Sequence, residues 1–216
     1  MARFRRRVRY LRRPVRRYRR RKYFRQRRRV AKGSMYVKIT KCSTVQVPNN
    51  TTSTWGTQFK PADLPEYEHL APNFERVKFL RIKVRVIPMQ NVSNSSTSLV
   101  PGYCMLPWHN PGGVQKDFNT FLSCDRAKIY RQTERGHQSY VPNTLIHAAS
   151  EGSGAAYQQM VWKPEIRRTT NIVDQPTIYG GLIAFQGDTT LEGRTSTFNV
   201  IQDIYCIFRN QTTFTV

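Results

Sequence analysis

The first thirty residues constrain this chain more than any other feature, because they cannot build a globular core. Residues 1–30 contain sixteen Arg, one Lys and no Asp or Glu, so they carry a charge of +17. Repulsion among these charges, with few apolar residues to oppose it, disfavours any compact state. The charge run stops at residues 31–34, Ala-Lys-Gly-Ser. We therefore expect a disordered basic arm over residues 1–34 and a folded domain over residues 35–216.

Such an arm requires a polyanionic partner, and the rest of the chain is only mildly basic. The net charge of the whole chain is +23, which leaves +6 for residues 31–216. Nucleic acid fits better than an anionic membrane or an acidic protein, because each neutralised phosphate releases a condensed counterion. The Arg guanidinium also binds phosphate oxygens in a bidentate manner. The predicted nucleic-acid-binding cations are Arg3, Arg5, Arg6, Arg7, Arg9, Arg12, Arg13, Arg16, Arg17, Arg19, Arg20, Arg21, Lys22, Arg25, Arg27, Arg28 and Arg29.

Aromatic residues are interleaved with these cations. In a segment without a core, they indicate stacking on unpaired bases, at about 1–3 kcal/mol per base. A solvated linker with incidental aromatic residues is the alternative. The same basic clusters are also typical of a nuclear localisation signal. Beside Phe4, the predicted stacking residues are Tyr10, Tyr18, Tyr23 and Phe24.

The clearest strand of the body spans Val77 to Ile87, where apolar and basic residues alternate. A period of two over this length predicts a strand with one buried face. The residues expected to face the core are Leu80, Ile82, Val84 and Val86, and those expected on the opposite face are Arg81, Lys83 and Arg85. The basic stripe either faces nucleic acid inside a shell or is the solvated side of a half-buried strand.

The rest of the body also favours strands. We expect an irregular connection over residues 54–75 with a helical turn near Asp63–Leu70, and a short helix capped by Asp117. The Gly180-Gly181 pair suggests a bulge. About eight strands without a helical period indicate a sandwich, a jelly roll or a barrel. Besides Val77–Ile87, the expected strands are Met35–Val47, Leu99–Trp108 (towards an edge, because of Pro101 and Pro107), 127–132, 139–141, 158–162, 178–186 and 196–210.

No motif for catalysis or metal binding is found. Phosphate-loop, GxSxG and HExxH patterns are absent, and the spacing of Cys and His does not match paired zinc ligands. We therefore expect no enzymatic activity, no cofactor and no metal. Neither a membrane-length apolar run nor the apolar core of a signal peptide is present. Four well-separated cysteines, Cys42, Cys104, Cys124 and Cys206, then indicate a reduced intracellular protein with free buried thiols.

Three segments resemble the capsid proteins of the circovirus family, and the size resembles its cyclovirus branch. The opening MARFRRRVRYLRRPVRRYRRRKYFRQRRR is similar to the Arg-rich, Tyr-dotted N-terminus of that family. FERVKFLRIKVRVIP, at Phe74–Pro88, is similar to its basic alternating strand that ends in Pro. TFNVIQDIYCIFRN, at Thr197–Asn210, is similar to its last strand.

This resemblance implies a single eight-stranded jelly roll, made of two packed antiparallel sheets. Sixty copies would form a T=1 icosahedral shell around a circular single-stranded DNA genome. The arm would bind the genome and direct nuclear import, so the protein would occur in the virion and the host nucleus. Surface loops would mediate attachment to host receptors, for which glycosaminoglycans are the family-level expectation. Sixty arms would carry roughly 1,000 positive charges, which suits a small genome.

Other functions remain as alternatives. A ribosomal-type RNA-binding protein would normally have a more basic body. A nuclease would need clustered carboxylates for metal ions, and a membrane-active arm would need an apolar face. Shell contacts would come from exposed loop residues such as Trp55, Trp108 and Trp162, although these side chains could equally belong to the core.

Overall fold

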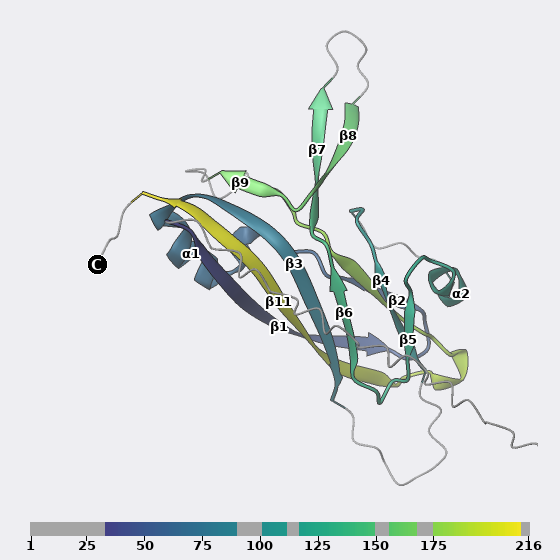
Figure 1. Ribbon diagram of the computed structural model, residues 1–216. Coiled ribbons are helices and arrows are strands. Elements are labelled where there is room, and N and C mark those ends of the chain that lie inside the picture. Colours follow the sequence, from purple (N-terminus) through teal and green to yellow (C-terminus); the bar gives the residue numbers. More distant parts are fainter. Residues whose placement is uncertain (1–32, 90–100, 112–116, 150–155, 168–174, 213–216) are drawn as a thin grey trace, which may run out of the picture.

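The computed structural model describes residues 33–89, 101–111, 117–149, 156–167 and 175–212. Within these ranges the protein is a sandwich of antiparallel sheets, with a separate two-stranded hairpin (Figure 1). Residues 1–32 of the predicted arm lie outside these ranges.

The first sheet has five strands. Its order is β1-β11-β3-β6, and the short strand β9 also pairs with β3. The central strand β11 pairs antiparallel with β1 on one side and β3 on the other. The bounds are β1 Met35–Pro48, β3 Phe74–Pro88, β6 Gly136–Tyr140, β9 Glu165–Arg167 and β11 Thr195–Gln211.

The second sheet has four strands in the order β2-β10-β4-β5. Consecutive strands of the chain cross repeatedly between the two sheets, and the first strand lies beside the last, as in a jelly roll. The bounds are β2 Ser53–Gly56, β4 Tyr103–Pro107, β5 Lys128–Tyr130 and β10 Gly181–Phe185, and the separate hairpin consists of β7 Asn143–Ala149 and β8 Ala156–Trp162.

Helices are short. The predicted turn near 63–70 is the helix α1, and its Tyr67 packs against Phe79 and Phe208. The predicted helix after Asp117 is α2, although the Asp117 side chain makes no capping hydrogen bond. The bounds are η1 Pro61–Asp63, α1 Pro65–Leu70, η2 Ala71–Asn73, α2 Phe118–Leu122 and η4 Thr189–Leu191.

The main core lies between the two sheets. The five-stranded sheet contributes one face of β3 and β11, including the fully buried Ile82, Val84 and Ile204. The central strands of the four-stranded sheet are buried on both faces, because α2 covers their outer side with Phe118 and Phe121. Its strands β4 and β10 are therefore apolar throughout and do not alternate.

One residue of the predicted inward set does not face the core. Tyr205 pairs with Arg81 and Cys206 with Phe79, so Leu80 is an extra residue on β3. This β-bulge reverses the side-chain parity, and Leu80 is only half-buried while Phe79 takes the core position. Ile82, Val84 and Val86 are buried as predicted.

Two further expectations are wrong. Strand β4 is not at an edge but pairs with both β10 and β5, because Pro101 precedes the strand and Pro107 ends it. The Gly180-Gly181 pair makes no bulge. It allows close packing, since a Cβ on Gly181 would lie 2.4 Å from the ring of Tyr140.

The all-β fold with two packed antiparallel sheets is confirmed. Apart from β9, the two large sheets are built from eight strands, β1–β6, β10 and β11. The sequence analysis missed β2 among them. It also missed β7, which pairs with β8 in the separate hairpin, and β9, which adds a short pairing to β3.

Replacing Ile82 with Ala should lower the free energy of unfolding by about 2–5 kcal/mol, because it leaves a cavity between the sheets. Ile87→Ala is the control on the same strand, since Ile87 is only half-buried. Its loss should be about 1 kcal/mol or less. Urea denaturation measures both changes, and equal losses would contradict the assignment of Ile82 to the core.

Candidate nucleic-acid interface

The outer face of the five-stranded sheet gathers basic side chains from three strands. Apolar residues of β1, β3 and β11 point into the core, so the residues between them point outward. The pairing places Lys38, Tyr205 and Arg81 side by side, and Thr40, Asp203 and Lys83 in the next outward row. The cations that β1, β3 and β11 place on this outer face are Lys38, Arg76, Lys78, Arg81, Lys83, Arg85 and Arg209, and β9 adds Arg167 opposite Arg76.

Asp203 holds the middle of the face together. Its carboxylate side chain is only 6% exposed and accepts two hydrogen bonds from Nη2 of Arg85, at 3.0 and 3.2 Å. Thr40 Oγ1 donates a third at 2.9 Å, and Lys38 Nζ lies 3.8 Å away. Asp203 therefore links β1, β11 and β3, and it neutralises Arg85.

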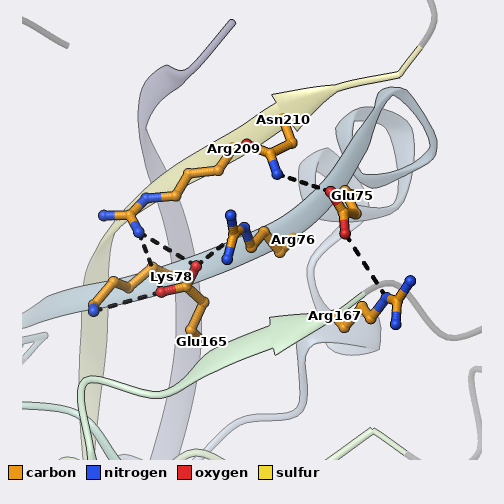
Figure 2. A network of polar contacts seen from close by, with 7 residues as sticks. All are labelled: Glu75, Arg76, Lys78, Glu165, Arg167, Arg209 and Asn210. Atoms are coloured by element: carbon orange, nitrogen blue, oxygen red, sulfur yellow. Dashed lines mark hydrogen bonds and ion pairs between the residues drawn. The ribbon is translucent and has the colours of Figure 1, made fainter. Parts of the chain in front are cut away.

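Glu165 acts similarly at the end of the sheet where β9 joins β3 (Figure 2). Three cations approach its carboxylate: Arg76 Nε at 3.4 Å, Lys78 Nζ at 3.5 Å and Arg209 Nη1 at 3.3 Å. Beside this group, Asn210 donates a hydrogen bond to Glu75, which lowers the pKa of that carboxyl group. The cations at this end are largely committed to fastening β9 and β11 to β3.

The predicted stripe of Arg81, Lys83 and Arg85 lies on this one face, but its three members differ. Arg85 is bound to Asp203. Arg81 donates a hydrogen bond to Ser139 Oγ and lies 5.9 Å from the ring centroid of Tyr205, without a carboxylate partner. Within the described part of the chain, Lys83 forms no ion pair. Among the described residues, Arg81 and Lys83 are thus the members of the stripe that form no ion pair, although Asp203 is the cross-strand neighbour of Lys83.

Aromatic residues beside the stripe were not singled out from the sequence. Tyr36 of β1 is half-exposed, and its ring centroid lies 6.3 Å from that of Tyr205 on β11. With Arg81 next to them, these rings offer a surface on which unpaired bases can stack. The alternation around Tyr36 was the available signal, but its pairing with Tyr205 depends on strand register.

A basic hollow adjoins the other end of the stripe. Its volume is about 360 Å³, and Lys83 and Arg85 line it together with Arg135 and His137 at the start of β6. The sequence analysis did not select Arg135, which lies in the turn before β6 and is brought to the stripe only by the pairing of β6 with β3.

The predicted arm joins the sheet that carries this basic face. Met35, the first residue of β1, pairs with Phe208, and Gln211 N donates a hydrogen bond to Gly33 O. The arm therefore joins β1 near Arg209, at the end of the sheet where Glu165 contacts cations of β3 and β11. The arm residues predicted to bind nucleic acid lie outside the described residues.

The cysteines and tryptophans are distributed differently from the expectation. Cys104 and Cys206 are buried, and burial raises the pKa of their thiols to about 11 and about 12. Cys42 is exposed and Cys124 half-buried, so the prediction that all four are buried is wrong. The four are free thiols.

Of the tryptophans, Trp55 and Trp108 pack against the core while remaining half-buried, and only Trp162 is exposed. No group of three or more His, Cys, Asp or Glu that could hold a metal ion occurs among the described residues. In the same part of the chain, no helix is long and apolar enough to span a bilayer.

Comparisons with known proteins agree with this architecture. A family model described as "Circovirus capsid protein" matches residues 5–212. The sequence is 40% identical over 191 residues to the capsid protein of Human associated cyclovirus 1, and the match covers 87% of each chain.

Solved structures show the same fold at low sequence identity. The 60-mer BFDV capsid protein matches with a TM-score of 0.64 and 13% identity, over 85% of this chain and 97% of that one. The decameric BFDV capsid protein gives 0.54 and 13%, over 82% and 99%. Cucumber Leaf Spot Virus gives 0.52 and 8%, over 84% of this chain and 52% of that one. The predicted jelly-roll fold is confirmed.

Replacing Asp203 with Ala should lower the free energy of unfolding by about 1–3 kcal/mol, because charge-assisted hydrogen bonds across three strands are lost. Asp125→Ala is the matched control, since its side chain is 91% exposed. That change should stay within about 0.5 kcal/mol. Chemical denaturation reports both values. Similar stability of the two variants would show that Asp203 does not fasten the sheet.

Proposed function

Because the chain belongs to the circovirus capsid protein family, we propose that sixty copies of it form a T=1 icosahedral shell around circular single-stranded DNA. It is a viral capsid protein of the circovirus type and so a component of the virion. The family is structural, and no enzymatic role is proposed. The observation that carries the assembly proposal is the match to the family over residues 5–212. The 60-mer formed by the BFDV capsid protein supports the number of copies.

In this proposal residues 1–34 bind the genome and residues 35–216 form the shell. The arm carries +17 and the remainder +6, so most of the favourable counterion release on DNA would come from the arm. Binding through phosphates is insensitive to sequence, which suits packaging of a whole genome. Tyr10, Tyr18, Tyr23 and Phe24 would stack on its unpaired bases.

The outer face of the five-stranded sheet would continue this DNA-binding surface. The arm leads into β1 at one end of that sheet, so a strand held by the arm can reach Arg81 and Lys83 without crossing the sandwich. Neither residue forms an ion pair within the described ranges, and Tyr36 and Tyr205 lie beside Arg81. Arg85 has instead a structural role, through Asp203. This arrangement supports the reading of the stripe as a nucleic-acid contact over that of a merely solvated face.

Two finer roles follow from the family and remain predictions. Dense Arg clusters suit recognition by nuclear import receptors, which would take the protein to the host nucleus. Attachment to cell-surface glycosaminoglycans would require cations on the outside of the shell. The Arg clusters on which the import role depends lie outside the described residues.

Deleting residues 1–30 should weaken binding of single-stranded DNA by at least roughly 100-fold at moderate salt and flatten its salt dependence. The body should keep its β-sheet circular dichroism, because the arm contributes no core. Fluorescence anisotropy with a labelled oligonucleotide across a salt series measures the effect. Equal affinity of a folded truncated protein would refute the role of the arm.

In the protein lacking residues 1–30, Lys83→Ala should reduce the slope of log K against log salt for single-stranded DNA by about 0.7, the loss of one phosphate contact. Lys128→Ala removes the same charge from β5 of the other sheet and should leave the slope unchanged. If both variants behave alike, the outer face of the five-stranded sheet is no preferred contact.

A further inference from the structure

The hairpin β7–β8 stands apart from the sandwich. Its strands pair with each other and with neither of the two large sheets, and Figure 1 shows the hairpin extending away from them. Among the described side chains, its contacts with the rest of the protein lie at its base, where Asn143 bridges to Tyr179 and the ring centroid of Trp162 lies 4.6 Å from that of His109. A two-stranded hairpin without a further layer is marginally stable in water. A packing partner would therefore stabilise it.

One face of the hairpin is apolar and open. Leu145 pairs with Met160, and side chains two residues apart on β8 share a face, which places Met160 and Trp162 together. Met160 is 38% exposed and Trp162 is 51% exposed. On the opposite face the exposed Gln159 is paired with Ile146, which is 47% exposed, so exposed apolar side chains occur on both faces and position 159 is a polar site among them. Near the base, Thr144 on that opposite face is already buried and donates a hydrogen bond to Thr177 O.

Charge identifies the partner of this apolar face. No Lys or Arg occurs between Arg135 and Lys163, in a chain whose net charge is +23. A segment without Lys or Arg offers no cation for phosphates or for an anionic surface, which argues against nucleic acid as its main ligand. For two copies of a basic chain, however, it is the region where like-charge repulsion is weakest. Exposed Trp and Met side chains on a neutral background are typical of the centre of a protein–protein interface.

We infer that the face formed by Leu145, Met160 and Trp162 packs against a second copy of this chain when subunits assemble. This inference rests on the proposed function, because it presupposes that the protein forms a shell. In this proposal the hairpin mediates assembly. A neighbouring subunit packs on it outside the sandwich and supplies the layer that is missing over its apolar face.

The test compares Met160→Glu with Gln159→Glu in the full-length chain. Each variant adds one carboxylate to β8. Because positions 159 and 160 are adjacent in a strand, the two carboxylates lie on opposite faces of the hairpin. Met160→Glu would bury a charge at every hairpin contact of a shell, so we expect the protein concentration needed for particle formation to rise at least about tenfold. Gln159→Glu should assemble as the wild type does. Sedimentation and electron microscopy follow particles, and circular dichroism together with DNA binding follows the folded, DNA-competent subunit.

A second measurement needs no substitution. Amide hydrogen exchange of β7 and β8 in wild-type particles should be at least about tenfold slower than in particles dissociated by salt, because the hairpin amides open only when the contact is lost. Normal assembly of Met160→Glu, equal effects of the two variants, or unchanged exchange on assembly would each overturn the inference. Wild-type protein that forms no particles at all would instead overturn the proposed function, and this inference with it.

Discussion

The burial of one face of β3 and β11 against the four-stranded sheet determines most of what this protein presents to its surroundings. Apolar side chains such as Ile82, Val84 and Ile204 must point inward, so the residues between them must point outward. On β3 those intervening residues are the basic Arg81, Lys83 and Arg85, whereas on β11 they include Asp203 and Tyr205. The core and the basic outer face are therefore two results of one alternation, and neither can be changed in register without displacing the other.

A face with this many cations needs internal counterions, and the chain supplies them sparingly. Asp203 neutralises Arg85 in the middle of the sheet, and Glu165 draws together Arg76, Lys78 and Arg209 at its end. Both carboxylates cross-link strands that are distant in sequence. Arg81 lies between them and Lys83 is paired with Asp203 across the strands, and neither forms an ion pair with an acid that the structure describes. The same face thus combines cations that hold the sheet together with cations that remain available to a polyanion.

How far the sequence alone predicts this structure depends on how strongly each segment alternates. The long strands β1, β3 and β11 were predicted because one face of each is buried and the other faces solvent, which gives an alternating sequence pattern. Strand β2 is too short to show a period, and β7 has apolar residues on both faces, so neither was recognised. The bulge at Leu80 has no local signal, since it is defined by the partner strand. The stripe of Arg81, Lys83 and Arg85 was visible in the sequence.

The assignment of roles within that stripe was not visible. Arg85 and Asp203 are 118 residues apart, and their contact exists only because β11 pairs with β3 in one register. The same holds for the rings of Tyr36 and Tyr205. Local patterns therefore predicted which side chains share a face, whereas the long-range pairing decides which of them have partners.

The central position of β11 has a consequence for how the protein is made. Thr40 and Asp203, which meet in the finished sheet, are 163 residues apart, so β1 and β3 have no neighbour between them until residues 195–211 have left the ribosome. Such non-local pairing is slow, because the loop entropy is lost before any contact compensates for it. The basic arm, residues 1–34, meanwhile emerges from the ribosome before every strand. During translation each nascent chain is a polycation attached to an unfinished sheet, and cellular RNA meets it before the sandwich exists.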